Sequence, residues 1–271
     1  MADSFTYGDG DIAHAHEILR VVAGSESTGM AIPGSSDRDE MAIYIEIPEQ
    51  LLGLESSSDH YTEKTAEPGV RSTWSDKDSV SYSFRKFMKL ATDGNPSILT
   101  LLFASNELVI RDSVWADQLR KLTPSIVSLQ AGYRHLGYLD GQRERMDGRG
   151  SRRRVPNRPE LIDAYGYDTK YASHALRLGY QGIEIITKGA LALPMDREPL
   201  EACMKVKRGE VGFLTALKMV DNVRDELAAL LVSKPTIIRP KPDMETVNIG
   251  MVQITHSYWN ETFGFWRTQL G

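Results

Sequence analysis

Two aspartates, one residue apart at the start of an apolar segment, restrict most strongly how this chain can fold. In residues 21–48, VVAGSESTGMAIPGSSDRDEMAIYIEIP, an apolar run ends in Gly24-Ser25, a loop of small residues follows, and Asp37 and Asp39 open a second apolar run. Along a β-strand, residues i and i+2 point to the same face of the sheet. The segment therefore predicts a strand that begins with two neighbouring carboxylates.

This acid pair favours a cation and a phosphate group as ligands. Two close carboxylates repel each other unless water or a cation neutralises them, and Mg²⁺ commonly takes one or two carboxylates together with substrate phosphates. Gly24 lets the backbone approach a ligand, and backbone N–H groups with the Ser25 hydroxyl can hold phosphate oxygens. Asp-x-Asp alone is common in surface turns, but its combination with the preceding Gly-Ser favours a nucleotide-handling site.

Hydrophobic periodicity predicts mixed α/β structure up to about residue 105. We expect a short helix over 11–19, strands in 19–25 and 42–48, a long surface loop over 49–77, and a strand that becomes a helix over 78–94.

Helices are expected to dominate the rest of the chain. One begins at Asn95-Pro96, because proline at the first helical turn costs no hydrogen bond. Three apolar stripes have helical spacing: Ile126, Leu129, Tyr133 and Leu136; Ala172, Ala175, Leu176, Gly179, Ile183 and Ile186; and Val211, Leu214, Leu217, Leu227 and Leu231.

Composition excludes several classes of protein. The chain of 271 residues, 41% of them hydrophobic, can bury a core, and its net charge of -5 argues against general coating of nucleic acid, although a local basic patch can still serve. Its one cysteine, Cys203, excludes an internal disulfide framework and a cysteine-rich zinc site. The N-terminal segment lacks the plan of a signal peptide, and no apolar run reaches the length of a membrane span. We expect a soluble, cytoplasmic protein without a membrane partner.

Several separate motifs resemble one known family. They are GS…SDRDEMAIYIE, YSFRKFMKLATDGNPSILTLLF, NRPELIDAYGYDTKYASHALRLGYQGIEIITKG and VKRGEV. In this order they are similar to nucleotidyltransferases of the DNA polymerase β-like superfamily found in bacteria and phages, one branch of which is associated with RNA repair. The resemblance covers most of the chain.

The resemblance implies a fold and a domain organisation. The fold class would be α+β: a polymerase β-like core, with a small mixed sheet and helices, followed by a mostly helical C-terminal region. Residues 1–105 would form the catalytic core, and residues 106–271 a helical domain with an arginine-rich loop.

The resemblance also implies catalytic residues. Asp37 and Asp39 would bind two Mg²⁺ or Mn²⁺ ions, and the family pattern D-x-x-x-Y-S places the third carboxylate at Asp78. Asp76 is the near alternative, because the sequence does not fix the strand register. The implied reaction moves a nucleoside monophosphate from an NTP to a hydroxyl group and releases pyrophosphate.

Two residues depart from the pattern of the relatives. Glu26 follows Gly-Ser where RNA-repair relatives more often carry a basic residue, and Thr28 stands where many carry an aromatic residue or histidine. An acid beside bound phosphates repels them unless it points away, so these departures leave the choice of nucleotide open.

Arginine is concentrated in residues 141–161, where the sequence is GQRERMDGRGSRRRVPNRPEL. Glycine, proline and weak periodicity predict a loop. Because the arginine fork suits phosphate oxygens, this loop is a candidate for contact with a triphosphate or a nucleic-acid backbone; a solvated loop is the alternative. The candidate residues are Arg152, Arg153, Arg154 and Arg158.

Lys170, His174 and Arg177 are spaced to form a polar stripe on a helix. The stripe is a candidate nucleotide-binding surface, since three cationic groups on one face can bind phosphates. Ordinary surface charge, or a hydrogen-bonded core position for His174, is the alternative.

Three functions remain open from the sequence. The leading one is nucleotidyl transfer to a hydroxyl acceptor such as an RNA 3′ end. The second is nucleotidylation of a protein or small molecule, and the third is nucleic-acid binding by a catalytically inactive relative. The oligomeric state is not predicted.

Overall fold

The structure is a computed structural model that describes residues 5–7, 10–34, 37–54, 58–66, 76–146, 158–233 and 237–264, with only the backbone for 5–7. The chain forms two compact units. Unit 1 comprises Met1–Thr92, Ser97–Ile126 and Pro242–Gly271, and unit 2 comprises Asp93–Pro96 and Val127–Lys241. These are not the ranges 1–105 and 106–271, whose functional division stays a prediction.

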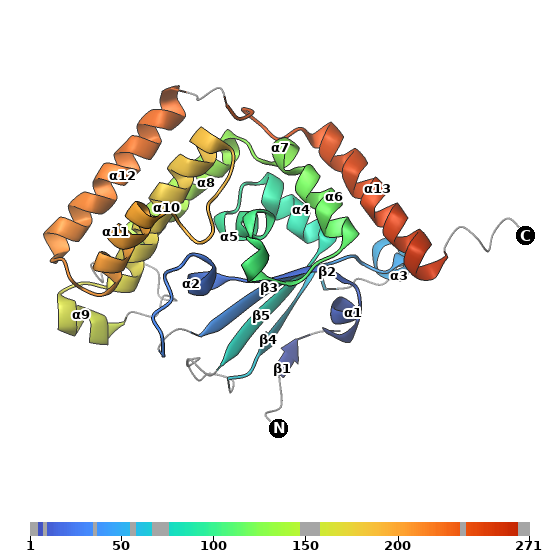
Figure 1. The fold of residues 1–271 in the computed structure, drawn as a ribbon, viewed down its shortest axis with the longest axis horizontal. Coiled ribbons are helices and arrows are strands. Elements are labelled where there is room, and N and C mark those ends of the chain that lie inside the picture. The colour runs from blue at the N-terminus through green and yellow to red at the C-terminus, as the bar shows by residue number, and fades with distance from the viewer. Residues whose placement is uncertain are drawn as a thin grey trace, which may run out of the picture. The chain divides into compact units, whose positions relative to one another are not determined.

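Unit 1 is built on a six-stranded mixed sheet with the order β1-β4-β5-β3-β2-β6 (Figure 1). Strands β3 and β5 are parallel, and the other neighbours are antiparallel. The strands are β1 (Phe5–Tyr7), β2 (Glu17–Val22), β3 (Arg38–Tyr44), β4 (His60–Lys64), β5 (Lys77–Ser83) and β6 (Val109–Arg111). The small mixed sheet of the predicted α+β class is therefore confirmed.

Helices of different lengths complete unit 1. They are α1 (Gly10–Ala15), α2 (Gly24–Ser27), α3 (Pro48–Leu52), α4 (Phe84–Thr92), α5 (Pro96–Leu99), α6 (Val114–Lys121), α7 (Thr123–Ile126) and α13 (Met244–Phe263). As expected, a strand, β5, leads directly into a helix, α4, whose apolar face is buried. The long helix α13 is anchored by Trp259, whose Nε1 donates to the Glu46 carbonyl oxygen at 2.8 Å.

The prediction for residues 11–19 and the loop prediction for 49–77 were wrong in part. The first helix ends at Ala15, and β2 begins at Glu17. The expected loop contains α3 and β4. Strand β4, HYTEK, buries only Tyr61 and so has no apolar alternation, yet it pairs with both β1 and β5. The conformation of β4 is therefore determined by its backbone hydrogen bonds to β1 and β5, which cannot be read from the pattern of its side chains.

Unit 2 is helical, as expected for the later part of the chain. Its helices are α8 (Leu129–Arg143), α9 (Pro159–Tyr165), α10 (Thr169–Lys188), α11 (Arg197–Lys207) and α12 (Phe213–Ser233). Helix α10 packs against α8, α11 and α12. A Cβ atom at Gly179 would overlap the Val223 side chain, and one at Gly182 would overlap Leu227 and His135. These glycines therefore permit the close approach of the helices.

Two predicted apolar stripes are wrong in part. On α8 the exposed fraction of Tyr133 is 51%, while Gly132 and His135 are buried instead. A Cβ at Gly132 would overlap Ile186 and Leu231, so a small residue makes this contact. On α12, Leu214 has an exposed fraction of 78%. Because a small residue makes this contact on α8, the buried face of the helix cannot be predicted from the spacing of large apolar side chains alone.

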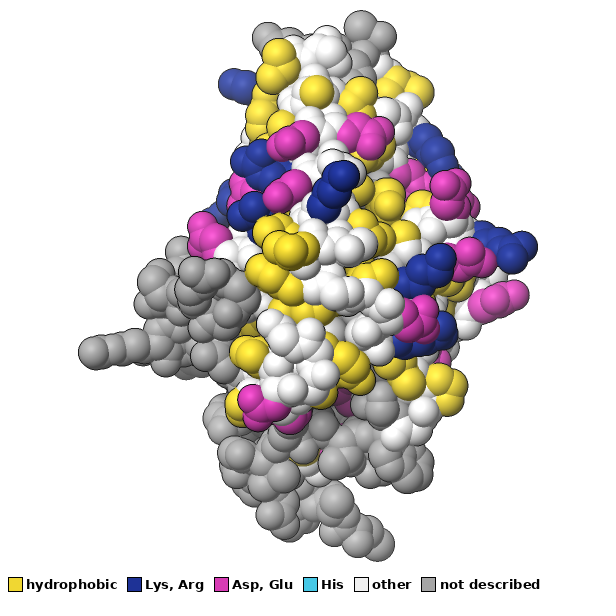
Figure 2. All heavy atoms as spheres, turned by 90° about the vertical axis from the view of Figure 1, so that its left-hand side faces the viewer, with side chains coloured by type: hydrophobic (Ala, Val, Ile, Leu, Met, Phe, Trp, Pro, Cys, Tyr) yellow, Lys and Arg dark blue, Asp and Glu magenta, His cyan; other side chains and the backbone are white. Residues whose placement is uncertain are grey.

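The side of the molecule that carries α12 and α9 has a mixed surface. Figure 2 shows acidic, basic and hydrophobic side chains interspersed there. Arg143 Nη2 donates to Asp221 Oδ2 at 3.1 Å, and Arg224 Nε donates to Asp140 Oδ1 at 2.7 Å, so two ion pairs join α8 to α12. Each of these partly exposed pairs contributes little to stability.

Among the described residues, no helix is both long enough and apolar enough to cross a membrane.

His135 makes the stability of unit 2 depend on pH. Its Nδ1 donates to the Ala131 carbonyl oxygen at 2.7 Å, and burial lowers its pKa to about 4 from 6.5. Between these values the unfolded chain binds the proton more tightly, so stability falls as the pH is lowered through this window. We expect the His135 contribution to the free energy of unfolding to fall by up to about 3 kcal/mol between pH 7 and pH 4.

Urea unfolding at pH 7 and pH 5 checks this expectation. His135→Leu should lose less stability than the wild type on acidification, whereas His256→Gln, at an exposed histidine, should behave as the wild type. Burial also lowers the pKa of His174, so the stability of His135→Leu will still depend on pH. The test is therefore the difference in the loss of stability between this variant and the wild type. Parallel profiles for His135→Leu and wild type would contradict the assignment.

Candidate metal and nucleotide site

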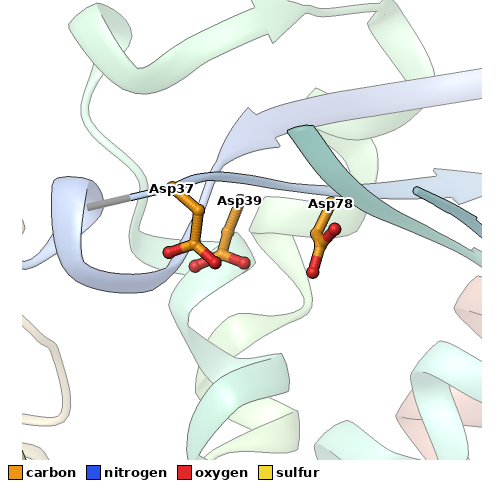
Figure 3. Close-up of side chains that lie close together, drawn as sticks. All are labelled: Asp37, Asp39 and Asp78. Atoms are coloured by element: carbon orange, nitrogen blue, oxygen red, sulfur yellow. The ribbon is translucent and has the colours of Figure 1, made fainter. Parts of the chain in front are cut away.

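Three carboxylates converge at one end of the parallel strand pair in unit 1. Asp37 directly precedes β3, Asp39 lies in β3, and Asp78 lies opposite Asp39 in β5. One carboxylate oxygen from each residue lies within 4.8 Å of the others. Figure 3 shows the three side chains projecting on the same side of the sheet. All three are partly exposed, so a ligand can reach them.

This donor set fits a hard divalent cation. It offers carboxylate oxygens, the ligand type preferred by Mg²⁺ and Mn²⁺. The cluster has no histidine or cysteine ligand among the described residues, as a zinc site usually would. Three like charges this close repel one another unless water or a cation screens them. Asp37, Asp39 and Asp78 could therefore hold Mg²⁺ or Mn²⁺.

Asp76, the alternative third carboxylate, has a different setting. Its Oδ1 accepts a hydrogen bond from Thr65 Oγ1 at 3.2 Å, and its carbonyl oxygen accepts one from the Arg38 backbone N–H at 3.2 Å. The cluster of three carboxylates contains Asp78. The pairing of β3 with β5 places Asp78 beside Asp39.

The Gly-Ser turn lies directly against the carboxylates. Gly24 has φ +63°, and a Cβ atom on it would overlap the Asp39 carboxylate. The Ala23 backbone N–H donates to the Asp39 carbonyl oxygen at 2.9 Å. Ser25 is partly exposed beside Gly24. The turn thus has both the conformation and the close approach that only glycine provides.

The geometry agrees with what comparison with known proteins shows. The family model described as "RNA repair pathway DNA polymerase beta family" matches residues 11–239, most of the chain. The chain belongs to the RNA repair pathway DNA polymerase beta family. No curated protein and no solved structure was found to match. Membership confirms the resemblance seen in the motifs and indicates a nucleotidyltransferase-type role.

The two departures from the pattern of RNA-repair relatives have local explanations. Glu26 Oε1 lies 3.9 Å from Arg38 Nη1. Arg38 also donates to Glu40 Oε1 at 3.1 Å, and Arg38 and Glu40 lie on the face of β3 opposite to Asp39. An arginine therefore offsets part of the Glu26 charge. Thr28 is buried, and its hydroxyl donates to the Ser25 carbonyl oxygen at 3.1 Å, which stabilises the turn.

The predicted nucleotide-binding stripe lies in unit 2. Lys170, His174 and Arg177 are all partly buried on α10. Burial lowers the pKa of His174 well below its usual value, and positive charges on Arg177, Lys170, Lys207 and Arg158 add to the effect. Arg158 lies over the ring of Tyr171, which belongs to the same helix as the stripe, while Arg152, Arg153 and Arg154 lie outside the described residues.

Sequence reasoning missed a cation beside the carboxylates. Lys64 lies in β4 directly opposite Asp78, and its Nζ donates to Asp78 Oδ2 at 2.8 Å. It offsets part of the negative charge of the cluster. The sequence would have indicated this contact only if β4 had been predicted as a strand, because the antiparallel register of β4 with β5 places Lys64 opposite Asp78.

A buried ionic network behind the carboxylates was also missed. Arg20 of β2 donates to Glu17 Oε2 at 3.0 Å and to Glu40 Oε2 at 2.9 Å. Burial opposes ionisation of Glu40, but hydrogen bonds from Lys77, Arg20 and Arg38 outweigh it and lower the pKa of Glu40. The network joins β2, β3 and β5 on the sheet face opposite to Asp39, and so fixes the strands that carry the site.

Proposed function

We propose that the protein is a metal-dependent nucleotidyltransferase that moves a nucleoside monophosphate from an NTP to a hydroxyl acceptor. The observation that carries the proposal is the convergence of Asp37, Asp39 and Asp78 at the end of a parallel strand pair. Family membership supports a nucleotidyltransferase-type role. The words "RNA repair pathway" in the family description favour an RNA 3′ end as the acceptor.

Each carboxylate has a role in this proposal. Asp37 and Asp39 would hold Mg²⁺ or Mn²⁺, and Asp78 would share in this and help to activate the acceptor hydroxyl. Bound divalent ions supply Lewis-acid polarisation of phosphoryl oxygens and, as a pair, stabilise the attacking and leaving oxygens of an in-line displacement. Lys64 keeps Asp78 oriented through the hydrogen bond between them.

The chemical step is a displacement at the α-phosphorus. The acceptor oxygen forms a bond to the α-phosphorus, and its proton passes to the Asp78 carboxylate. The bond from the α-phosphorus to the bridging oxygen breaks, and pyrophosphate leaves with the electron pair.

Two separate sets of residues are proposed to bind phosphate. Gly24 and Ser25 hold phosphate oxygens through backbone N–H groups and the serine hydroxyl. Lys170, His174 and Arg177 bind the nucleotide. Arg152, Arg153, Arg154 and Arg158 contact phosphates of the nucleotide or of a nucleic-acid acceptor.

Transfer of label from each α-labelled NTP tests the proposal. The protein is incubated with Mg²⁺ or Mn²⁺ and, in separate reactions, with RNA, DNA and protein acceptors. Label that appears on RNA only, and that disappears with EDTA, is the expected result. Label on protein would instead establish nucleotidylation of a protein. RNA binding without NTP binding and without transfer would refute the enzyme and support an inactive nucleic-acid-binding protein.

A further inference from the structure

A cavity of about 500 Å³ lies in unit 1 at the far end of the strands that carry the aspartates. Its wall comes from α3 and the residues after it, from the segment before β4, from the end of β5 and from the start of α4. Ser83, the last residue of β5, lines the cavity and follows Asp78 by five residues. Along a strand this spacing corresponds to about 17 Å. The cavity is therefore separate from the carboxylate site, and its volume is typical of sites for small organic molecules.

Three cations of α4 line this cavity. Arg85 and Lys86 lie in the first turn of the helix, which contains no acidic residue, and Lys89 lies one turn later. The N-terminal end of a helix carries partial positive charge, so cations are unfavourable there and anions are favourable. Arg85 and Lys89 are four residues apart and so repel each other on one face of the helix. An anion bound in the cavity would relieve both effects.

The acidic groups beside the cavity leave two of these cations unpaired. Lys86 Nζ forms an ion pair with Asp59 Oδ2 at 2.8 Å. Glu46 is buried, which raises its pKa, and hydrogen bonds to its carboxyl group only partly oppose this effect. No carboxylate of the described residues forms an ion pair with Arg85 or Lys89. The cavity therefore offers two accessible cations to a ligand.

Another part of the lining is apolar. Leu51 and Leu54 contribute to it, and the side chain of Leu54 is completely exposed. Covering such apolar surface with a ligand is favourable. The combination of cations and leucines fits an anion that carries an organic group better than it fits an inorganic ion.

The charge of the cavity favours a phosphate monoester over a carboxylate. A phosphate monoester carries a charge of about −1.5 to −2 at pH 7, whereas a carboxylate carries only one negative charge. Residues four apart on a helix are neighbours, so one phosphate group can reach both Arg85 and Lys89. Its oxygens suit the planar arginine fork and the lysine ammonium group.

We propose that this cavity is a second ligand site, which binds a small organic phosphate monoester. Arg85 and Lys89 hold the phosphate group, and Leu51 and Leu54 contact the organic part. The site does not depend on the proposed function, because binding requires neither the aspartates nor a divalent cation.

Calorimetric titration of the full chain with phenyl phosphate in EDTA tests the site. Arg85→Met and Lys89→Met should each bind about tenfold more weakly than the wild type, because each loses a hydrogen bond to a charged group. Lys121→Met is the matched control, since Lys121 is an exposed lysine at the end of α6 and does not line the cavity. This control should bind as the wild type. Absence of binding by the wild type, unchanged binding by the first two variants, or equal losses in all three would overturn the proposal.

Comparison of probes tests the class of ligand. Benzoate carries one charge and inorganic phosphate lacks an organic group, so both should bind about tenfold more weakly than phenyl phosphate. Equal affinity for benzoate would overturn the assignment to a phosphate, and equal affinity for inorganic phosphate would overturn the contact with the leucines. Leu54→Ser should weaken the binding of phenyl phosphate but not that of inorganic phosphate. AMP should bind more tightly than an RNA oligonucleotide with a 5′-phosphate; the reverse order would overturn the assignment to a small molecule.

Stability measurements guard against variants that merely misfold. Without ligand, Arg85→Met should melt at the same temperature as the wild type or higher, because a cation is removed from the first turn of α4. Phenyl phosphate should raise the melting temperature of the wild type and of Lys121→Met more than that of Arg85→Met. A rise of equal size in Arg85→Met would refute its role.

The double variant Asp37→Asn, Asp39→Asn separates this site from the carboxylates. It should bind phenyl phosphate and AMP in EDTA as the wild type does. Loss of this binding would place the ligand at the aspartates and overturn the proposal. If the wild type binds phenyl phosphate but transfers no nucleotide, the proposed function fails and the second site stands.

Discussion

Asp39→Asn is expected to abolish most nucleotidyl transfer while leaving the fold intact. The change keeps the size of the side chain but removes the charge that faces Asp37 and Asp78. A bound metal ion contributes several kcal/mol to the stabilisation of charge in the transition state, so the loss should be about 10³-fold or more in kcat. The melting temperature in EDTA should stay the same or rise, because repulsion between like charges is reduced.

Two variants provide the control, one at Asp78 in β5 and one at Asp76, which directly precedes this strand. Asp78→Asn should show a loss similar to that of Asp39→Asn, and Asp76→Asn should keep nearly full activity, since Asp76 bonds to Thr65 outside the cluster. The rates are compared at saturating NTP and metal. If Asp76→Asn loses activity and Asp78→Asn does not, the third carboxylate has been assigned to the wrong residue.

Gly24→Ala, which adds only a methyl group near the site, is expected to lower both stability and activity strongly. The added Cβ would overlap the Asp39 carboxylate, and the positive φ of Gly24 disfavours any side chain. The left-handed conformation alone costs about 1–2 kcal/mol. Displacement of Asp39 should lower kcat by about 10²-fold, as small misplacements of catalytic groups do.

Gly34→Ala separates strain from overlap. Gly34 also has a positive φ, +75°, but a Cβ there meets nothing within 4 Å. This variant should lose a similar amount of stability from backbone strain and keep its activity. Comparison of melting temperature and kcat for the two variants is the measurement. Equal losses of activity would show that the contact between Gly24 and Asp39 is not what matters.

The sequence predicts the carboxylate pair because a local rule suffices. The two-residue period of a strand places Asp37 and Asp39 together, and an apolar run after them indicates a strand. Asp78 needed the family resemblance, because nothing local sets the register that places it opposite Asp39. Gly24 was recognised as a turn residue, but its contact with Asp39 depends on how β2 and β3 pair.

Features that depend on distant partners escaped sequence reasoning. Strand β4 has no apolar alternation, so the pairing of Lys64 with Asp78 was hidden with it. Arg20 reads as a polar interruption in an apolar strand, and only the folded sheet shows its partners Glu17 and Glu40.

Binding of Mn²⁺, measured by its electron paramagnetic resonance signal in the presence of a non-hydrolysable NTP analogue, tests the central claim most directly. The wild type should bind Mn²⁺ at the carboxylate cluster, with tighter binding when the analogue is present. The double variant Asp37→Asn, Asp39→Asn should lose this binding while remaining folded. Equal Mn²⁺ binding by the wild type and the folded double variant, with or without the analogue, would contradict the assignment of these carboxylates to a metal–nucleotide site.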